Sequence, residues 1–424
     1  MLLLNLSLNL LDLYIKDWLR MKKIVSKVEV YAVISAVFLM IFLPVLWGIG
    51  FSYRLYDNLP WPGVSIFSHL GFLIAAAIFI SKFKKMAAAD MFYFNLVLAY
   101  VFMGTAYSLL FILFSTEEYK LDAFMQSVVY LVHFCAFMAI GFTVFELKWP
   151  KIFVLLLFLV YVLLAYFEHN MSSTIPVSLY SIYGEFTDVV PNYQLVSLSV
   201  VFLCLLLYRT NIKYKTVFVL MALFMVFLTG GRSEFLGGVI SLFFFLLLSI
   251  LTTLSKRMMV KRVYLYSILM IVFFALIFIY IYFYTDADLG ISNNRNLQVF
   301  NLKEASSWQA RENLESKNLE LIFKSPFVGN FGSHFSLGQG SYIHNILSVW
   351  QQYGFFSFLM YLIIMIFPVV NLSIVFIKKE SVGLAGPLVL SFYCLLLMAV
   401  SKSVFWPYAG LSVGSYLYVR YTRV

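Results

Sequence analysis

The chain has 424 residues, of which 62% are hydrophobic, 19% aromatic and only 12% charged. Soluble domains contain roughly 45–50% apolar residues, so this composition excludes an ordinary soluble domain and predicts an all-α protein that crosses a membrane many times. The net charge is +10, but no basic patch is interleaved with a soluble fold, so we do not expect nucleic acid as a partner.

The first 28 residues are rich in Leu and then basic. A secretory signal peptide has the opposite order, because its positive charge precedes the apolar run. We therefore expect residues 1–28 to form a cytoplasmic segment at the membrane interface. Met21 is an alternative start, in which case residues 1–20 carry no function.

Apolar runs long enough to span a bilayer recur along the chain. A helix needs roughly 20 apolar residues to cross a hydrocarbon core about 30 Å thick, so we predict about twelve spans. Nine fall within residues 29–285 and three within residues 354–424, on either side of a long polar interval at 286–353. The runs are 29–50, 62–81, 91–114, 123–145, 150–167, 192–208, 214–230, 233–254, 263–285, 354–377, 384–401 and 405–419.

Basic clusters alternate between the spans and fall on the same side as the basic N-terminus. The positive-inside rule makes this side cytoplasmic, so the polar interval is periplasmic in a Gram-negative cell or extracellular otherwise. No internal repeat is apparent, which argues against a transporter built of two equal halves. The clusters are Lys82, Lys84 and Lys85; Lys148 and Lys151; Arg209, Lys213 and Lys215; Lys256, Arg257, Lys261 and Arg262; Lys378 and Lys379; and Arg420 and Arg423.

The polar interval contains one run with the pattern of a helix, residues 306–324. Ser306 or Ser307 can cap its N-terminus, and Pro326 ends it because proline disfavours a helical conformation in the residue before it. A turn-rich piece follows, and then apolar sequence resumes close to His344. We therefore expect His344 at the boundary between water and membrane.

Arg232 lies at the outer junction between two predicted spans. Arginine beside hydrocarbon is costly and usually has a partner. Gly231 lets a ligand approach the backbone, and Ser233 opens a helix whose amides attract anions. Arg232 is therefore either a phosphate-binding residue or an arginine that only extends to the interface.

Arg311 and His344 each have a functional and a structural interpretation. Arg311 could bind an anion, or it could form a weak surface pair with Glu315 four residues later. His344 can titrate near neutral pH and accept a proton from a hydroxyl, or it could be a hydrogen-bonded loop residue. The remaining histidines lie in apolar runs or in loops without a recognisable setting: His69, His133, His169 and His334.

The sequence contains no Asp-rich metal motif, no Gly-Lys phosphate loop and no serine elbow, so we expect catalysis without a metal or a cofactor. The three cysteines are scattered through apolar runs and predict neither a disulfide framework nor a metal cluster. They are Cys135, Cys204 and Cys394.

Three short motifs occur in order within residues 180–380. The first is Thr-Gly-Gly-Arg-Ser, which contains Arg232. The second is Arg311, about four helical turns before a Pro-Phe-Val-Gly turn, and the third is a His344-Asn345 pair that opens a helix ending in Gly. Together they resemble motifs of the O-antigen polymerase and O-antigen ligase superfamily of bacterial surface-polysaccharide assembly. One departure is Glu315, where that family often has Trp.

The resemblance implies a helical glycosyltransferase of GT-C type that uses an undecaprenyl-diphosphate-linked glycan without a metal. Arg232 and Arg311 would clamp the diphosphate bidentately, supported by Gly231 and Asn345, and His344 would be the catalytic base. The implied partners are the lipid-linked donor and acceptor, the bilayer and a co-polymerase that regulates chain length. The implied location is the bacterial inner membrane, with the active site on the periplasmic side.

We favour a polymerase, which transfers the glycan to the next lipid-linked repeat unit, with inversion because nothing indicates a covalent intermediate. The reasons for this preference are the short segment between Gly329 and His344 and the resemblance of the Tyr-x-His-Asn-x-Leu-Ser run at 342–348 to polymerase sequences. A ligase that delivers the glycan to the lipid A core is the alternative. A flippase is less favoured because the spans are nearly free of the midplane charges it would need.

Overall fold

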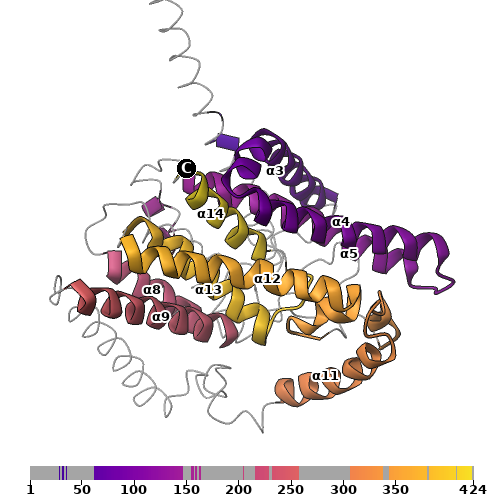
Figure 1. Ribbon diagram of the computed structural model, residues 1–424. Helices are drawn as coiled ribbons and strands as arrows, with labels where there is room; N and C mark the ends of the chain where they lie inside the picture. Colours follow the sequence, from indigo (N-terminus) through magenta and orange to yellow (C-terminus); the bar gives the residue numbers. More distant parts are fainter. Residues whose placement is uncertain are drawn as a thin grey trace, which may run out of the picture.

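The described residues of the computed structural model lie mainly in helices (Figure 1). The predicted N-terminal segment, the spans at 29–50, 150–167, 192–208 and 263–285, and residues 286–305 lie outside the described residues, apart from single positions. The described ranges are 62–146, 215–228, 232–256, 306–337, 343–379, 382–406 and 408–422, with a few positions within 28–35 and 154–163, and residue 204.

The described residues form helices and turns without a strand, which confirms the all-α prediction for this part of the chain. Eight of these helices coincide with predicted spans. They are α3 (Pro62–Ala89), α4 (Met91–Phe114), α5 (Lys120–Glu146), α8 (Lys215–Leu228), α9 (Arg232–Lys256), α12 (Leu347–Lys379), α13 (Ala385–Val400) and α14 (Ala409–Tyr421).

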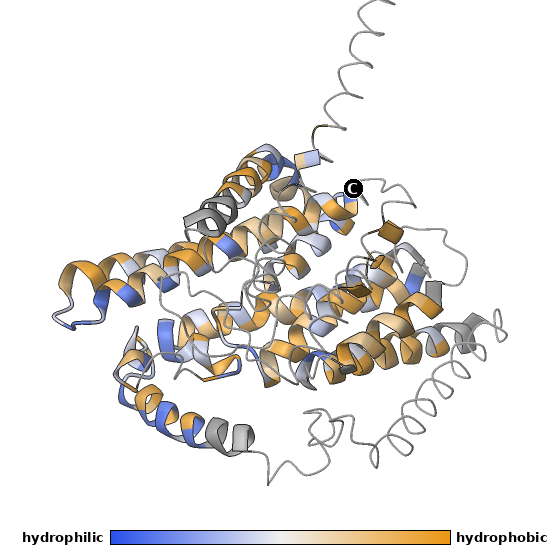
Figure 2. Ribbon diagram, turned by 180° about the vertical axis from the view of Figure 1, so that it is seen from behind, coloured by the Kyte–Doolittle hydropathy of each residue, from blue (hydrophilic) through white to orange (hydrophobic). Residues whose placement is uncertain are grey.

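Four helices, α4, α5, α9 and α12, are long and apolar enough to cross a membrane, and α8 and α13 are shorter apolar helices. The described part of the chain is thus consistent with a helical membrane protein, while the total of twelve spans stays a prediction. The polar interval supplies α11 (Ser306–Lys324), with the predicted bounds, and the 3-10 turn η4 (Ser333–Leu337); η5 (Val382–Leu384) precedes α13. Figure 2 shows mainly hydrophobic helices, whereas α11, at the lower left, carries many hydrophilic residues.

Helix α14 is almost completely buried, surrounded by α3, α5, α12 and α13 (Figure 1). At two glycines of α14 its backbone lies so close to α5 that no side chain would fit. A Cβ atom on Gly410 would collide with the carbonyl oxygen of Phe134, and one on Gly414 with that of Met138. Glycines spaced by four residues let two helix backbones approach closely, as is common between helices in membranes.

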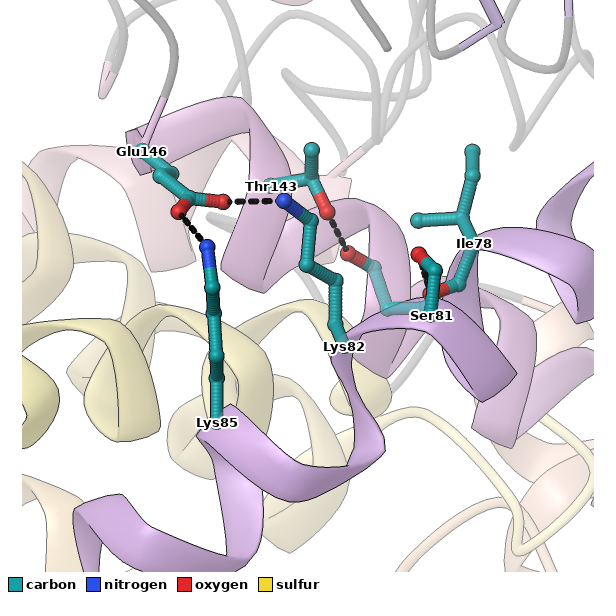
Figure 3. Close-up of polar contacts among 7 residues, drawn as sticks. Ile78, Ser81, Lys82, Lys85, Thr143 and Glu146 are labelled. Atoms are coloured by element: carbon teal, nitrogen blue, oxygen red, sulfur yellow. Dashed lines mark hydrogen bonds and ion pairs between the residues drawn. The ribbon is translucent and has the colours of Figure 1, made fainter. Parts of the chain in front are cut away.

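Ion pairs join four helix ends at one end of the bundle. The Glu146 carboxylate, at the end of α5, lies 2.7 Å from the ammonium groups of both Lys82 and Lys85 (Figure 3). Arg420, in the last turn of α14, lies 3.3 Å from the carboxylate of Asp90, the N-cap residue of α4. Residues from two of the predicted cytoplasmic clusters therefore lie at the same end of the bundle.

Aromatic contacts connect the elements at the opposite end of the bundle. Phe111, near the end of α4, packs edge-on against Phe331, with ring centroids 5.1 Å apart. Tyr119, just before α5, stacks on Phe335 of η4 at 5.9 Å. The segment between α11 and α12 is therefore attached to the turn between α4 and α5.

Candidate functional site

The three sequence motifs belong to three separate elements. Arg232 is the first residue of α9, Arg311 lies within α11, and His344 lies half-buried in the turn before α12. The side chains of Arg232 and Arg311, and the whole of Gly231, lie outside the described residues. The structure therefore shows how the three elements meet through the contacts of residues close to these arginines in the chain.

Asn345 connects the turn that carries His344 to α11. Its Nδ2 donates a hydrogen bond to Oε1 of Glu315 at 3.2 Å, and its Oδ1 accepts one from the Leu347 amide at 2.9 Å, at the start of α12. Glu315 lies one helical turn after Arg311. The carboxylate at the position where the resemblance leads us to expect Trp thus holds the Arg311 helix against the His344 turn.

A buried amide pair makes a second connection between the same two helices. Gln351 of α12 donates from Nε2 to Oδ1 of Asn318 in α11 at 2.5 Å and to Oγ of Ser333 at 3.2 Å. Asn318 in turn donates to the Leu314 carbonyl oxygen at 2.7 Å. Buried polar groups that are paired in this way fix one relative orientation of the helices, because any other leaves them unsatisfied.

The second and third motifs meet at Gly354. This residue has φ 78° and ψ 177°. A positive φ of this size favours glycine, and it interrupts the helical geometry of α12. The amide that follows it, of Phe355, donates to the carbonyl oxygens of Pro326 and Phe327 at 3.2 and 3.3 Å. A Cβ atom on Gly354 would collide with the Phe327 carbonyl, and one on Gly329 with the Gly354 amide nitrogen. The glycines that close the two motifs are therefore two halves of one backbone contact.

His334 is the centre of a buried hydrogen-bond chain between α5 and α12. Its Nε2 lies 2.9 Å from Oε1 of Gln126, and its Nδ1 accepts from Nε2 of Gln352 at 3.0 Å, while Oε1 of Gln352 accepts from the Gly332 amide. Burial lowers the pKa of His334 from 6.5 to about 4, so the ring is neutral at pH 7 with its proton on Nε2. Its role is to anchor the η4 segment.

A buried ion pair connects α9 to the loop between α13 and α14. The Lys402 ammonium donates to Oε1 of Glu234, and Oγ of Ser233 donates to Oε2 of the same carboxylate at 2.9 Å. Glu234 is fully buried and lies two residues after Arg232. The position of the α9 N-terminus thus depends on the 401–408 loop.

The same loop is bonded to the start of α12. The Val404 amide donates to Oγ of Ser348 at 2.6 Å, and this hydroxyl lies 2.7 Å from the Asn345 carbonyl oxygen, to which it donates. A continuous set of contacts therefore runs from the residues beside Arg232, through Lys402 and Val404, to the residue beside His344. All three motif-bearing elements meet at the end of the bundle opposite the Glu146 ion pairs.

This arrangement is suited to binding an anion. The N-terminus of α9 lies at this end, and a helix N-terminus presents amides and a positive dipole to an anion. The first amides of α12 are instead bonded within its own turn, to Asn345 and Ile346. Half-buried His344 lies in the turn that opens α12. A positively polarised region beside a titratable imidazole can hold a diphosphate and accept a proton close to it.

The sequence singled out His344, Asn345 and the helix at 306–324 as candidates, but it gave no indication of most of the contacts that hold these elements together. His334 had no recognisable setting, and Glu234 and Lys402 were not among the candidates. Lys402 had one local signal, because it is flanked by serines between two apolar runs, on the predicted outer side, where basic residues are scarce. His334 had no such signal, because its partners are amides on other helices.

Comparison of the sequence with protein-family models and with curated proteins gives no match in either case.

Proposed function

We propose that the protein is a membrane glycosyltransferase of GT-C type that polymerises a surface polysaccharide. It transfers an undecaprenyl-diphosphate-linked glycan to the next lipid-linked repeat unit at the periplasmic face of the bacterial inner membrane. The observation that carries the proposal is the meeting of the three motif-bearing elements through Gly329 and Gly354, Asn345 and Glu315, and Glu234 and Lys402. Motifs scattered over more than a hundred residues would meet at one end of a bundle if they form one site.

In this mechanism Arg232 and Arg311 bind the donor diphosphate, aided by the amides at the start of α9. A guanidinium offers a planar pair of donors, so each arginine can contact two phosphate oxygens. His344 removes the proton from the acceptor hydroxyl as its oxygen bonds to the anomeric carbon. The bond from that carbon to the diphosphate breaks on the opposite face, the leaving group keeps the electron pair, and the configuration inverts.

The arrangement of charges supports a site on the outer side. Lys82, Lys85 and Arg420 lie at the opposite end of the bundle from Asn345 and Lys402. Since basic residues concentrate on the cytoplasmic side, the motif-bearing end faces outward. A lipid-linked donor presents its diphosphate at this interface, at the level of the two arginines.

A ligase that transfers the glycan to the lipid A core is the second candidate, because it would use the same donor and the same three motifs. A flippase is less well supported. Among the described residues, the buried charged side chains are Lys82, Glu234 and Lys402, and each is paired close to a helix end. A transport pathway would instead need charges near the middle of the spans.

The surface glycan of a deletion strain tests the proposal. Loss of a polymerase leaves single repeat units on the lipid A core, loss of a ligase leaves long chains on the carrier lipid, and loss of a flippase traps repeat units inside the cell. Complementation then tests the site. Arg311→Ala and Arg232→Ala should abolish long chains, and Lys should rescue poorly at either position because it lacks the planar fork.

Lys317→Ala is the matched control, because Lys317 is an exposed cation on the same helix as Arg311. It should restore long chains fully. Membrane levels of each variant must equal those of the wild type. If Arg311→Ala restores long chains as well as Lys317→Ala does, Arg311 is a surface residue and its proposed role is wrong.

A further inference from the structure

Helix α12 has a continuous apolar stripe along one side. Its exposed large hydrophobic residues recur every three or four positions, which places them on one face of the helix. Because α12 is long and apolar enough to cross a membrane, this stripe is its lipid-facing side. The stripe consists of Phe356, Leu359, Ile363, Ile366, Val370, Ile374 and Ile377.

The polar interval also exposes large apolar side chains, at the junction of α11 with the following turn. Phe323 is 71% exposed, Phe327 66% and Val328 65%. Grouped apolar side chains of this size are unfavourable in water and mark a surface that contacts a partner or a membrane. The remainder of α11 is mixed in character, with Lys317 and Glu320 exposed.

The turn is attached to the start of the lipid-facing stripe. The Phe355 amide bonds to the carbonyls of Pro326 and Phe327, and the rings of Phe327 and Phe355 lie with centroids 6.5 Å apart. Phe356, the next residue, is the first member of the stripe. The exposed side chains of the turn therefore begin where the lipid-facing stripe of α12 begins.

Trp350 marks the level of this contact relative to the membrane. Its Nε1 donates to the Pro326 carbonyl oxygen at 2.6 Å, and its ring stacks on Phe358 with centroids 5.3 Å apart. Tryptophan is enriched where a membrane meets water, since it has an apolar ring and a polar N–H. Exposed Lys324, at the end of α11, lies beside Phe323 and can reach headgroup phosphates.

We propose that the turn formed by residues 325–329, together with Phe323, inserts into the leaflet that surrounds the start of α12, where it contacts phospholipid acyl chains. Segments that insert from the interface penetrate about 5–10 Å, to the boundary of headgroups and acyl chains. Helix α11 is then held at the membrane surface by its C-terminal end. This inference depends on α12 crossing the membrane and not on the chemistry proposed above.

Fluorescence quenching in single-copy phospholipid nanodiscs without polyprenyl lipid tests the inference. A thiol-reactive fluorophore is attached to Phe327→Cys and, separately, to Val328→Cys. Ile363→Cys in the α12 stripe is the lipid control, and Lys317→Cys on α11 is the water control. The wild-type chain, labelled in the same way, gives the blank for the three native cysteines, of which two are buried and one is half-buried.

Labels at 327 and 328 should resemble the label at 363. Phospholipids brominated in their acyl chains should quench them several-fold more than they quench the label at 317, and aqueous iodide should quench them several-fold less. If iodide quenches the label at 327 as strongly as the label at 317, the turn lies in water and the inference is wrong. A label shielded from both quenchers would mean that protein covers the turn, which also overturns it.

Discussion

The Lys402 ammonium and the Glu234 carboxylate form a buried ion pair between residues separated by 168 positions in the chain. The pair joins the first turn of α9 to the loop between α13 and α14, two residues from Arg232. Removing two charges from water is costly, and their attraction compensates only when both partners are present. The placement of Arg232, near the middle of the chain, therefore depends on a residue near the C-terminal end.

Replacing one partner of this pair should destabilise the protein more than replacing both. Glu234→Ala breaks the buried ion pair by removing one partner, which typically costs about 3–5 kcal/mol. The double variant Glu234→Gln/Lys402→Met removes both charges and should lose much less stability. Thermal unfolding of the purified variants in nanodiscs measures the difference. Equal losses in the single and double variants would contradict the idea that breaking the ion pair on one side is the cause.

Gly414→Val should weaken the packing of α14 against α5. The new side chain would collide with the Met138 carbonyl oxygen, which belongs to a helix backbone and cannot move aside. Overpacking of this kind costs typically 1–3 kcal/mol and sometimes more. Gly104→Ala is the control, because its Cβ would meet only the flexible end of Leu131 at 3.1 Å. Similar melting temperatures for both variants would rule out the backbone collision.

Gly354→Ala should separate the turn after α11 from α12. The substitution combines an unfavourable positive φ with a collision against the Phe327 carbonyl, and the conformational part alone costs about 1–3 kcal/mol. Hydrogen exchange at the Phe355 amide should rise, and polymer formation should fall because α11 carries Arg311. Gly383→Ala, at a half-buried position in η5, provides the comparison. Unchanged exchange at Phe355 would contradict the prediction.

Stability should fall as the pH drops from 6.5 to 4, because His334 has to remain neutral in the fold. Its pKa is about 4 in the folded protein against an ordinary value of 6.5, so in this range the unfolded chain binds the extra proton. The contribution is fully present above pH 6.5, and the loss reaches about 3 kcal/mol near pH 4. His334→Gln lacks this titration. Melting temperatures of the two proteins across this range should converge at acidic pH, and parallel curves would contradict the prediction.

His344→Gln should slow turnover without weakening donor binding. Glutamine keeps a hydrogen bond but cannot accept the proton, and a positioned base typically contributes a factor of about 10²–10⁴ in rate. Single-turnover rates with purified protein and a defined lipid-linked donor, set against donor affinity, separate the two effects. Ser336→Ala, at an exposed position of the same polar interval, should match the wild type. An unchanged rate in His344→Gln would exclude the base role.

The positions of the described helices could largely be predicted from the sequence, because the signals for them are local. Helix α11 ends at Lys324, before the Ser325-Pro326 pair that was expected to stop it, and α4 covers the predicted run of apolar residues. A stop signal and a hydropathy window each involve only neighbouring residues. Membership of a family and the chemistry at the site stay predictions, because motif resemblance alone supports them.

The sequence predicted the course of α12 only in part. The sequence places a boundary between loop and span at Gly354, whereas α12 extends on both sides of this residue with one non-helical conformation inside it. The Phe355 amide finds its acceptors in Pro326 and Phe327, on another segment, and this satisfies the backbone where the helix is interrupted. No local sequence pattern predicts which distant segment supplies such an acceptor.

The sequence by itself determined the membrane-protein composition, the order of the helices and three short motifs. Only the tertiary structure decided that Gly329 meets Gly354, that Glu234 pairs with Lys402, and that His334 lies between amides of α5 and α12. The reason is physical, since a buried polar group or a backbone contact is stable only when its partner is present. In this protein those partners come from elements far apart in the chain, and their identity depends on how the helices pack.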